Sequence, residues 1–201
     1  STLERTTNGK GIVEKTTAAE LRKLRTKKGN KLIFLDELLE FLKPIKGLYV
    51  EFEMKTSPVE YYPEERLKEY CDKLYSAVMA ARPDDAEYVF TSSDYRGLRY
   101  LQQIHPGVDL LMITSKPCNA ETIDLALALG IKRIGCTMDG TSRQAVKKAH
   151  DKGLIVSLWP GYSPDDFMLG AYLGADFMCT DIPVQLKKFQ TEKAPWLKVI
   201  Y

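Results

Sequence analysis

Short apolar runs alternate with longer amphipathic stretches from about residue 48 to the end of the chain. Apolar runs bounded by turn residues are typical of buried strands, and their regular alternation with helix-length segments is typical of α/β proteins with a parallel sheet. The runs predicted to be strands are Leu48–Met54, Tyr88–Thr91, Leu110–Ile113, Ile131–Cys136, Leu154–Trp159 and Phe177–Cys179.

The stretches between these runs carry apolar residues at three- and four-residue spacing, which predicts helices packed outside a parallel sheet. Gly or Pro precedes the later strands, as at Gly130 and Gly153, and suits helix ends followed by tight turns. The regular occurrence of Gly or Pro before the strands favours one repeating domain. The clearest predicted helices are Pro63–Arg82, Ala120–Leu129, Ser142–Lys152 and Asp165–Leu173.

The first 47 residues have a different pattern. Thr17 and Glu20 have the spacing of a capping box, which predicts a short helix at that point. A second helix is predicted at about Leu35–Leu42 and stops near Pro44. We interpret residues 1–47 as an insertion-like segment ahead of six βα units in residues 48–201, all within a single domain spanning residues 1–201.

Both a doubly wound open sheet and a TIM (β/α)8 barrel satisfy this order of elements. No Gly-x-Gly-x-x-Gly follows any predicted strand, so a dinucleotide-binding sheet has no phosphate loop in this sequence. A barrel has eight strands, two more than the predicted six. We therefore expect the two further strands to precede Ser1, which makes the domain incomplete at its N-terminus.

Charged residues alternate with apolar residues in the first predicted strand. Glu51, Glu53 and Lys55 fall on one face, and Phe52 and Met54 fall on the other. An edge strand with a solvated face would give the same pattern. In a barrel, helices cover the apolar outer face, so the three charges would point into the barrel mouth.

Polar residues also follow the other predicted strands, and the carboxyl ends of parallel strands form the active-site face of a barrel. His105 and His150 instead precede strands, so we predict that both have structural roles. The polar and aromatic residues at the predicted carboxyl ends are Ser92, Asp94, Thr114 to Lys116, Thr137, Asp139, Trp159 and Asp181, of which Asp181 is expected to cap the last helix.

Composition narrows the classes of function. Of the 201 residues, 44 % are hydrophobic, and 29 Lys and Arg balance 27 Asp and Glu. This even balance argues against a nucleic-acid or membrane partner. No apolar run approaches the roughly 20 residues of a transmembrane helix.

The four cysteines lack the paired spacing of a zinc site or a redox dithiol. We expect all four to be buried free thiols, which slightly favours the cytoplasm, although an exported protein stays open. They are Cys71, Cys118, Cys136 and Cys179.

Three segments together resemble the signatures of glycerophosphodiester phosphodiesterases, in the same order. They are Leu3–Gly11 with its Arg-Thr-Thr-Asn-Gly run, Glu53-Met54-Lys55 at the end of a strand, and Leu173–Pro183 near the end of the chain. Ser92 and the Leu158-Trp159 pair also follow apolar strands as in that family. The resemblance covers nearly the whole chain.

The resemblance implies a barrel enzyme that hydrolyses small glycerophosphodiesters to glycerol 3-phosphate and an alcohol, with one divalent metal ion, Ca²⁺ or Mg²⁺. Glu53 matches the metal-ligand glutamate, and Lys55 matches a lysine that faces the phosphate. Trp159 matches an aromatic residue at the pocket rim, although Pro160-Gly161-Tyr162 follows it in place of the usual Thr-Val-Asn. Arg5 and Ser92 are further candidates for substrate contact.

Several family motifs do not occur in these 201 residues. The family uses a histidine in a His-Arg-Gly turn, a Glu-x-Asp pair of metal ligands and a second histidine in a His-Asp pair, and the sequence contains none of these. We expect them upstream of Ser1. Sequence alone leaves a homo-oligomer open.

Two alternatives accompany the enzyme interpretation. One is a catalytically inactive barrel domain that binds an anionic ligand around Lys55, Lys116 and Trp159. The other is a related phospholipase-type phosphodiesterase, against which the Arg-Thr-Thr-Asn-Gly run argues.

Overall fold

A computed structural model describes residues 2–198, and it contains a six-stranded sheet in the order β1-β2-β3-β4-β5-β6. The neighbouring pairs from β2 to β6 are parallel. The strands are β1 (Tyr49–Glu53), β2 (Glu87–Ser92), β3 (Leu110–Pro117), β4 (Arg133–Thr137), β5 (Ile155–Gly161) and β6 (Phe177–Thr180).

A helix follows each strand, so residues 2–198 contain six βα units. A doubly wound sheet reverses its strand order at a switch point, whereas this sheet keeps sequence order throughout, as a barrel does. The predicted α/β class and six βα units are confirmed; eight units are not seen in residues 2–198. The helices of these units are α3 (Glu64–Ala81), α4 (Tyr95–Ile104), α5 (Ala120–Ala128), α6 (Arg143–Asp151), α7 (Pro164–Leu173) and α8 (Pro183–Lys193).

The chain divides into two compact units. The first consists of Ser1–Val50 and Thr56–Tyr88, and the second consists of Glu51–Lys55 and Val89–Tyr201. Besides α3, the first unit contains α1 (Ala18–Leu21), α2 (Leu35–Leu42) and the 3₁₀ segments η1 (Leu3–Arg5), η2 (Val13–Lys15) and η3 (Val59–Tyr61).

Local signals determine the helices of the first unit. The Thr17 hydroxyl accepts a hydrogen bond from the Glu20 amide, and the Glu20 carboxylate accepts one from the Thr17 amide at 2.9 Å, so the predicted capping box is present. Helix α2 has the predicted bounds and packs against α3. Both expectations for this segment are confirmed.

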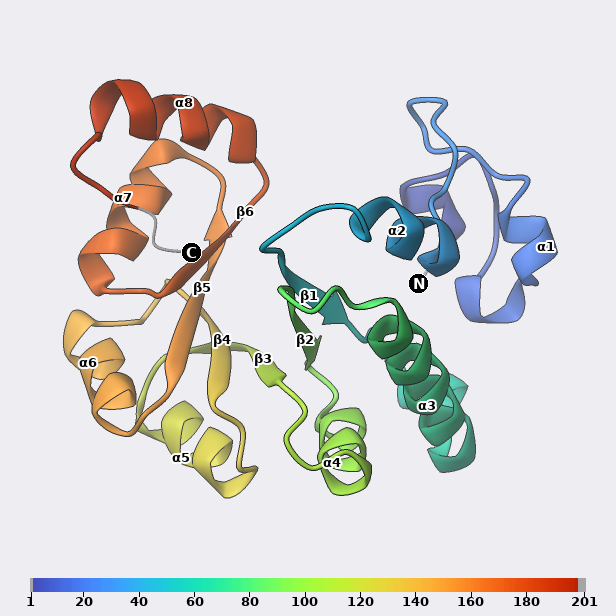
Figure 1. Ribbon diagram of the computed structural model, residues 1–201, viewed down its shortest axis with the longest axis horizontal. Coiled ribbons are helices and arrows are strands. Elements are labelled where there is room, and N and C mark those ends of the chain that lie inside the picture. Colours follow the sequence, from blue (N-terminus) through green and yellow to red (C-terminus); the bar gives the residue numbers. More distant parts are fainter. Residues whose placement is uncertain (1, 199–201) are drawn as a thin grey trace. The chain divides into compact units, whose positions relative to one another are not determined.

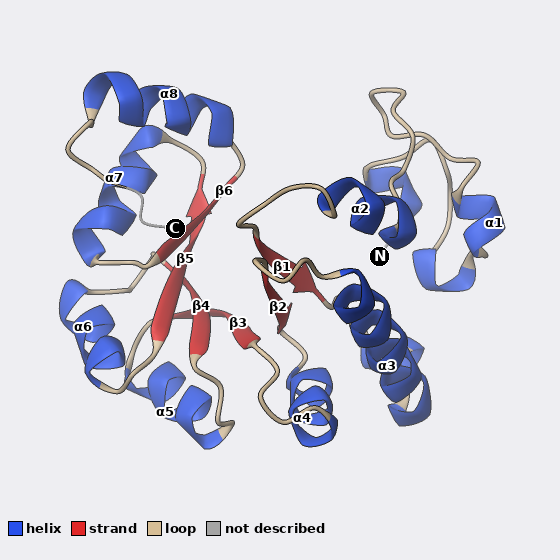
Figure 2. Ribbon diagram, viewed as in Figure 1, coloured by secondary structure: helices blue, strands red, loops and turns tan. Residues whose placement is uncertain are grey.

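In the second unit, helices cover one face of the sheet. Helices α5, α6 and α7 lie outside strands β3 to β6 (Figures 1 and 2), and α5 contacts β3 and β4 while α6 and α7 contact β5. The fully buried side chains of this unit come from both layers and include Phe90, Leu98, Leu101, Leu111, Met112, Ile134, Val146, Val156 and Leu158. This apolar layer holds the carboxyl ends of the strands in place.

Some boundaries differ from the sequence prediction. Strand β3 continues past the predicted end at Ile113 to Pro117, because pairing with β4 resumes after a register shift. Helix α4 lies between the second and third strands, where the alternation of segments predicts a helix, and its buried residues are Gly97, Leu98 and Leu101. The cap predicted at Asp181 is wrong: Ile182 is the N-cap of α8 and makes no side-chain cap bond.

Gly170 of α7 lies against the Met178 side chain of β6. A Cβ atom at this position would overlap the Met178 sulfur on β6, so only a residue without a side chain fits in the observed arrangement. Gly also ends α7, where Gly174 adopts a φ of 89° that favours glycine. Gly170 therefore permits the observed approach of α7 to β6, and Gly174 permits the turn that ends the helix.

We expect Gly170→Ala to lower the free energy of unfolding by about 1–3 kcal/mol, because the added methyl overpacks against Met178. Urea denaturation of the two single variants and the Gly170→Ala, Met178→Ala double variant measures the coupling. The loss caused by Gly170→Ala should be smaller in the Met178→Ala background. Equal losses of unfolding free energy in both backgrounds would show that the Met178 side chain does not restrict the residue at position 170.

Candidate active site

Strand β1 presents apolar and charged side chains to opposite sides. Phe52 and Met54 are 6 % and 1 % exposed, whereas Glu51, Glu53 and Lys55 are exposed. The alternation predicted from the sequence is therefore confirmed. We call the side of the sheet that carries Glu51 and Glu53 the inner face.

The strand register extends the inner face across the sheet. The Phe90 ring lies 6.1 Å from the Phe52 ring on the apolar side, so the next residue of β2, Thr91, belongs to the inner face. Thr91 pairs with Leu111 of β3, and the same alternation through β4 brings Thr137 and its partner Trp159 of β5 to this face. Trp159 thus lies at the carboxyl end of β5 on the same side as Glu53.

Cys179 of β6 also belongs to the inner face. It lies two residues after Phe177, which pairs with Ser157 of β5. Partial desolvation raises the pKa of the Cys179 thiol, and the negative charges of Glu51, Asp181 and Glu53 raise this pKa further. The carboxylates of β1 therefore act on a side chain of β6, and the inner face has a locally negative potential.

This potential can be measured through the reactivity of Cys179. We expect alkylation by iodoacetamide to be slow at pH 7 and to accelerate only above the ordinary thiol pKa, because the thiolate is the nucleophile. Glu51→Gln removes a negative charge, lowers the pKa of the thiol and should speed alkylation at pH 8. Glu69→Gln on α3 is the matched control and should have no effect. An unchanged pH profile in Glu51→Gln would contradict the assigned proximity.

The four cysteines do not share one environment. Cys71, Cys118 and Cys136 are buried as predicted, but Cys179 is exposed, which corrects the prediction for that residue. Its strand has a single sheet neighbour, β5, among the described residues, so the apolar sequence around it does not enclose the side chain. Cys118 and Cys136 are hydrogen-bonded to each other, which lowers the pKa of Cys118, and this bond together with burial raises that of Cys136.

Glu53 and Lys55 form an ion pair at the end of β1. The Lys55 Nζ lies 3.2 Å from a carboxylate oxygen of Glu53, and 72 % and 42 % of the two side chains are exposed. An exposed pair of this kind contributes little to stability and can exchange its partners. The site therefore offers one carboxylate and one ammonium group that a ligand can reach.

The carboxylate of Glu53 suits a hard divalent cation, which prefers oxygen ligands. The neighbouring Glu51 and Asp181 carry charge of the same sign within range of Cys179. Residues 2–198 contain no group of three or more His, Cys, Asp or Glu side chains that could hold a metal ion. The metal-ligand role of Glu53 stays a prediction.

Ser92 connects β1 to β2. Its hydroxyl donates a 2.7 Å hydrogen bond to the Met54 carbonyl and accepts one from the Asp94 amide at 3.0 Å, and the residue is fully buried. The Met54 amide in turn donates to the Thr91 carbonyl at 2.7 Å. Ser92 thus positions the end of β1, and the substrate contact predicted for Ser92 stays a prediction.

Three buried polar atoms on the inner face make no hydrogen bond to any described residue. They are the Trp159 Nε1, the Ser157 Oγ and the Thr91 Oγ1. An unsatisfied buried donor or acceptor costs about 1–3 kcal/mol, so a group left unpaired within the chain often serves a ligand or water. Sequence analysis identified Trp159 but missed Ser157 and Thr91, whose only signal is a hydroxyl within an apolar strand.

The Arg-Thr-Thr-Asn-Gly run lies in the first unit and organises its loop. The Thr7 hydroxyl donates to the Leu3 carbonyl at 2.7 Å, and the Asn8 side-chain oxygen accepts from the Arg25 amide at 2.9 Å. Arg5 is exposed at the end of η1. Its contact with substrate stays a prediction.

Both histidines lie at the amino-terminal ends of strands, as predicted. His105 is the C-cap residue of α4, ahead of β3. The His150 Nε2 lies 2.8 Å from an Asp176 oxygen, and that carboxylate also accepts a hydrogen bond from the Val156 amide. His150 therefore ties the end of α6 to the starts of β5 and β6.

Lys116 has an ion-pair partner of its own. It forms an ion pair with Glu121 on α5, and this hydrogen bond raises the pKa of the Lys116 ammonium. The two cations of the anion-binding alternative, Lys55 and Lys116, are both in exposed ion pairs within the chain. The binding-domain alternative stays a prediction.

The fold and site define an α/β protein in which the candidate site lies at the carboxyl ends of parallel strands that follow sequence order. The model of the glycerophosphoryl diester phosphodiesterase family matches residues 1–185, and the chain belongs to this family. Comparison with curated proteins gave no match. Within residues 2–198, none of the helices has the length and apolar character needed to cross a bilayer.

Solved structures agree on the fold. A phosphodiesterase of Oleispira antarctica, solved with the product sn-glycerol-3-phosphate, is 19 % identical with a TM-score of 0.81, and the match covers 93 % of this chain and 75 % of that one. A glycerophosphodiester phosphodiesterase of Parabacteroides distasonis is 19 % identical with a TM-score of 0.70, covering 89 % and 72 %. One from Thermotoga maritima is 14 % identical with a TM-score of 0.63, covering 93 % and 76 %.

Proposed function

We propose that the protein hydrolyses glycerophosphodiesters to glycerol 3-phosphate and an alcohol with the help of one divalent metal ion, Ca²⁺ or Mg²⁺. The observation that carries this proposal is the exposed Glu53–Lys55 pair on the inner face, in a chain of the phosphodiesterase family. The product bound to the Oleispira antarctica phosphodiesterase supports the same substrate class.

Glu53 and Lys55 have complementary roles in this proposal. When bound, a hard cation supplies positive charge that stabilises the phosphoryl oxygens during hydrolysis. Glu53 would give the cation one oxygen ligand, and Lys55, released from its ion pair, would turn to the phosphate. Each charge thereby exchanges one opposite partner for another, so the exchange leaves no charge unpaired.

The remaining inner-face residues would shape the pocket. The Trp159 ring would pack against the glycerol moiety, and its indole N–H, which has no partner among the described residues, would donate to a substrate oxygen. Arg5 and Ser92 are proposed as additional substrate contacts. The preferred alcohol would depend on the Pro160-Gly161-Tyr162 segment at the end of β5.

Neither histidine of the chain serves as general acid or base in this proposal. His150 is engaged with Asp176 ahead of β6, and His105 ends α4 ahead of β3, so both lie away from the carboxyl ends where the inner-face residues gather. A general acid or base must come within hydrogen-bonding reach of the reacting group. Replacing either histidine should therefore affect stability more than turnover.

The test is the rate of release of glycerol 3-phosphate from glycerophosphocholine and glycerophosphoethanolamine by the natural protein, with Mg²⁺, with Ca²⁺ and with excess chelator. Glu53→Gln should lower kcat/KM by about 100-fold or more, because a lost metal ligand removes several kcal/mol of transition-state stabilisation. Lys55→Met should chiefly raise KM, because it removes a phosphate contact.

Glu121→Gln is the matched control, since Glu121 also pairs with a lysine but lies on α5. It should retain full activity. Turnover that persists in excess chelator would exclude the metal role, and full activity of Glu53→Gln would exclude the assignment of this residue.

A further inference from the structure

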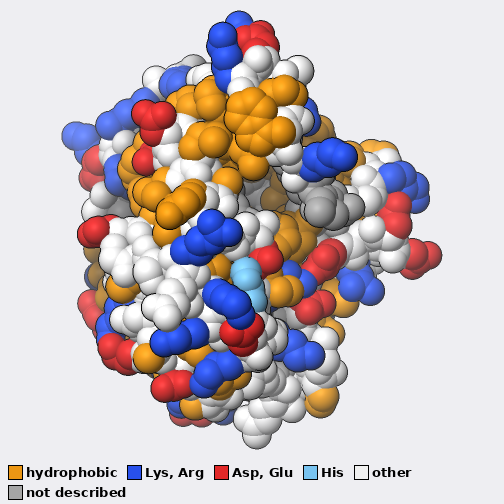
Figure 3. All heavy atoms as spheres, turned by 90° about the vertical axis from the view of Figure 1, so that its left-hand side faces the viewer, with side chains coloured by type: hydrophobic (Ala, Val, Ile, Leu, Met, Phe, Trp, Pro, Cys, Tyr) orange, Lys and Arg blue, Asp and Glu red, His pale blue; other side chains and the backbone are white. Residues whose placement is uncertain are grey.

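Helix α7 exposes a stripe of residues on its outer surface. Leu169 and Tyr172 are 45 % and 65 % exposed, and Asp165 lies four residues before Leu169 on the same side of the helix. In Figure 3, which faces the α6 and α7 side of the second unit, apolar side chains gather on the upper part of the surface with Lys and Arg side chains below them. An exposed Leu–Tyr pair of this kind needs a reason, since aromatic residues are enriched at the centres of protein interfaces.

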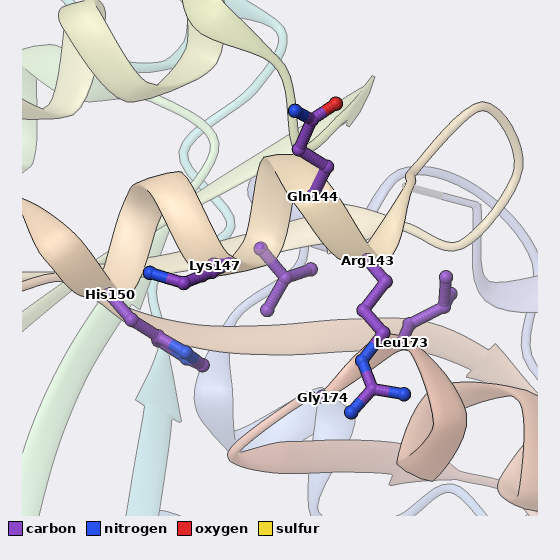
Figure 4. Close-up of a pocket in the computed structure, with 7 residues that line it drawn as sticks. Arg143, Gln144, Lys147, His150, Leu173 and Gly174 are labelled. Carbon is purple, nitrogen blue, oxygen red and sulfur yellow. The ribbon is translucent and has the colours of Figure 1, made fainter.

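Arg143 from α6 lies over one end of this stripe. Its guanidinium carbon is 5.5 Å from the centre of the Tyr172 ring. Figure 4 shows the Arg143 side chain extending towards Leu173 and Gly174 at the end of α7, along a groove of about 500 Å³ that Val146 also lines. The Arg143–Tyr172 contact thus joins α6 to α7 and holds both side chains in place.

Charges at the two ends of the stripe are opposite and have no ion-pair partner among residues 2–198. Asp165 stands at the start of α7 and Arg143 lies over its end, whereas the neighbouring cations Lys147 and His150 pair with Asp151 and Asp176. Along α7 the stripe is therefore negative at Asp165, apolar at Leu169 and positive at Arg143. A second copy in the antiparallel orientation would place its positive end beside the negative end of the first.

The spacing suits a two-fold axis at Leu169. With a rise of about 1.5 Å per residue, Asp165 lies roughly 6 Å to one side of Leu169 and Tyr172 roughly 4.5 Å to the other. Two α7 helices packed antiparallel would therefore bring each Asp165 beside the Tyr172 and Arg143 of the other copy. The same contact occurs twice, which is the property of an isologous dimer interface.

We propose that two copies of this chain associate through this stripe, with Leu169 against Leu169 at the centre and two Arg143–Asp165 ion pairs between the copies. A membrane surface fits the stripe less well, because anionic lipids would repel Asp165. The interface involves the outer surface of α6 and α7 and leaves the inner face open. It is independent of the proposed catalysis.

A contact made by one helix stripe is smaller than a standard interface, so the association should be weak, with a dissociation constant on the order of 10 μM. Sedimentation velocity of the natural protein from about 1 to 200 μM should show a concentration-dependent shift from monomer to dimer. Leu169→Asp should abolish this shift, because it places two carboxylates at the centre of the interface.

Charge exchange provides the decisive comparison. Arg143→Asp and Asp165→Arg should each weaken dimerisation at least tenfold, because each variant places like charges opposite one another. The double variant with both exchanges should restore the original dissociation constant. Leu127→Asp on α5, which replaces an equally exposed leucine elsewhere, is the control and should dimerise normally.

Each other outcome overturns the proposal. One such outcome is a natural protein that stays monomeric at every concentration. A second is a dimer whose dissociation constant is the same in Leu169→Asp and in the single charge variants. A third is a double charge variant that dimerises no more tightly than the single variants. Circular dichroism checks that each variant is folded. Vesicles of anionic phospholipid that bind the natural protein but not Leu169→Asp, without any dimer, would assign the stripe to a membrane instead.

Discussion

The hydrogen bond from the Met54 amide to the Thr91 carbonyl, 2.7 Å long, determines which side chains face the candidate site. It fixes the register of β1 against β2, and successive side chains of a strand point to opposite faces. A slip of one residue would turn Glu53 into the helix-covered layer and expose Phe52. The Ser92 hydroxyl, bonded to the Met54 carbonyl, secures the same register from the other strand.

Once this register is fixed, the parallel pairing of β2 to β6 determines which side chains of each strand lie on the inner face. Trp159 reaches it through β4 and β5, and Cys179 reaches it through β6. The negative charges of Glu51 and Glu53 on β1 contribute to the raised pKa of Cys179 on β6. The buried polar atoms of Thr91, Ser157 and Trp159 on this face have no hydrogen-bond partner among the described residues. Each costs free energy of folding unless a ligand or water satisfies it, so a sheet with only a structural role would avoid them.

Features that depend on local sequence could be predicted. The alternation around Glu53, the capping box at Thr17 and the βα order follow from residue periodicity and hydrogen-bonding chemistry within a few positions. The exposure of Cys179, the length of β3 and the unpaired Ser157 hydroxyl could not be predicted, because they depend on which strand lies alongside. Asp181 was misassigned as a cap for a local reason: the Thr180 hydroxyl accepts a hydrogen bond from the Ile182 amide, and the helix begins one residue later than expected.

The central claim is that metal and phosphate meet at the Glu53–Lys55 pair, and crystals of the natural protein grown with Mn²⁺ and glycerol 3-phosphate test it most directly. The account predicts an anomalous peak within about 2.0–2.6 Å of a Glu53 carboxylate oxygen. It also predicts that Lys55 has left Glu53 and that its Nζ lies within hydrogen-bonding distance of a phosphate oxygen. Metal and phosphate bound elsewhere, with the Glu53–Lys55 ion pair intact, would contradict the account.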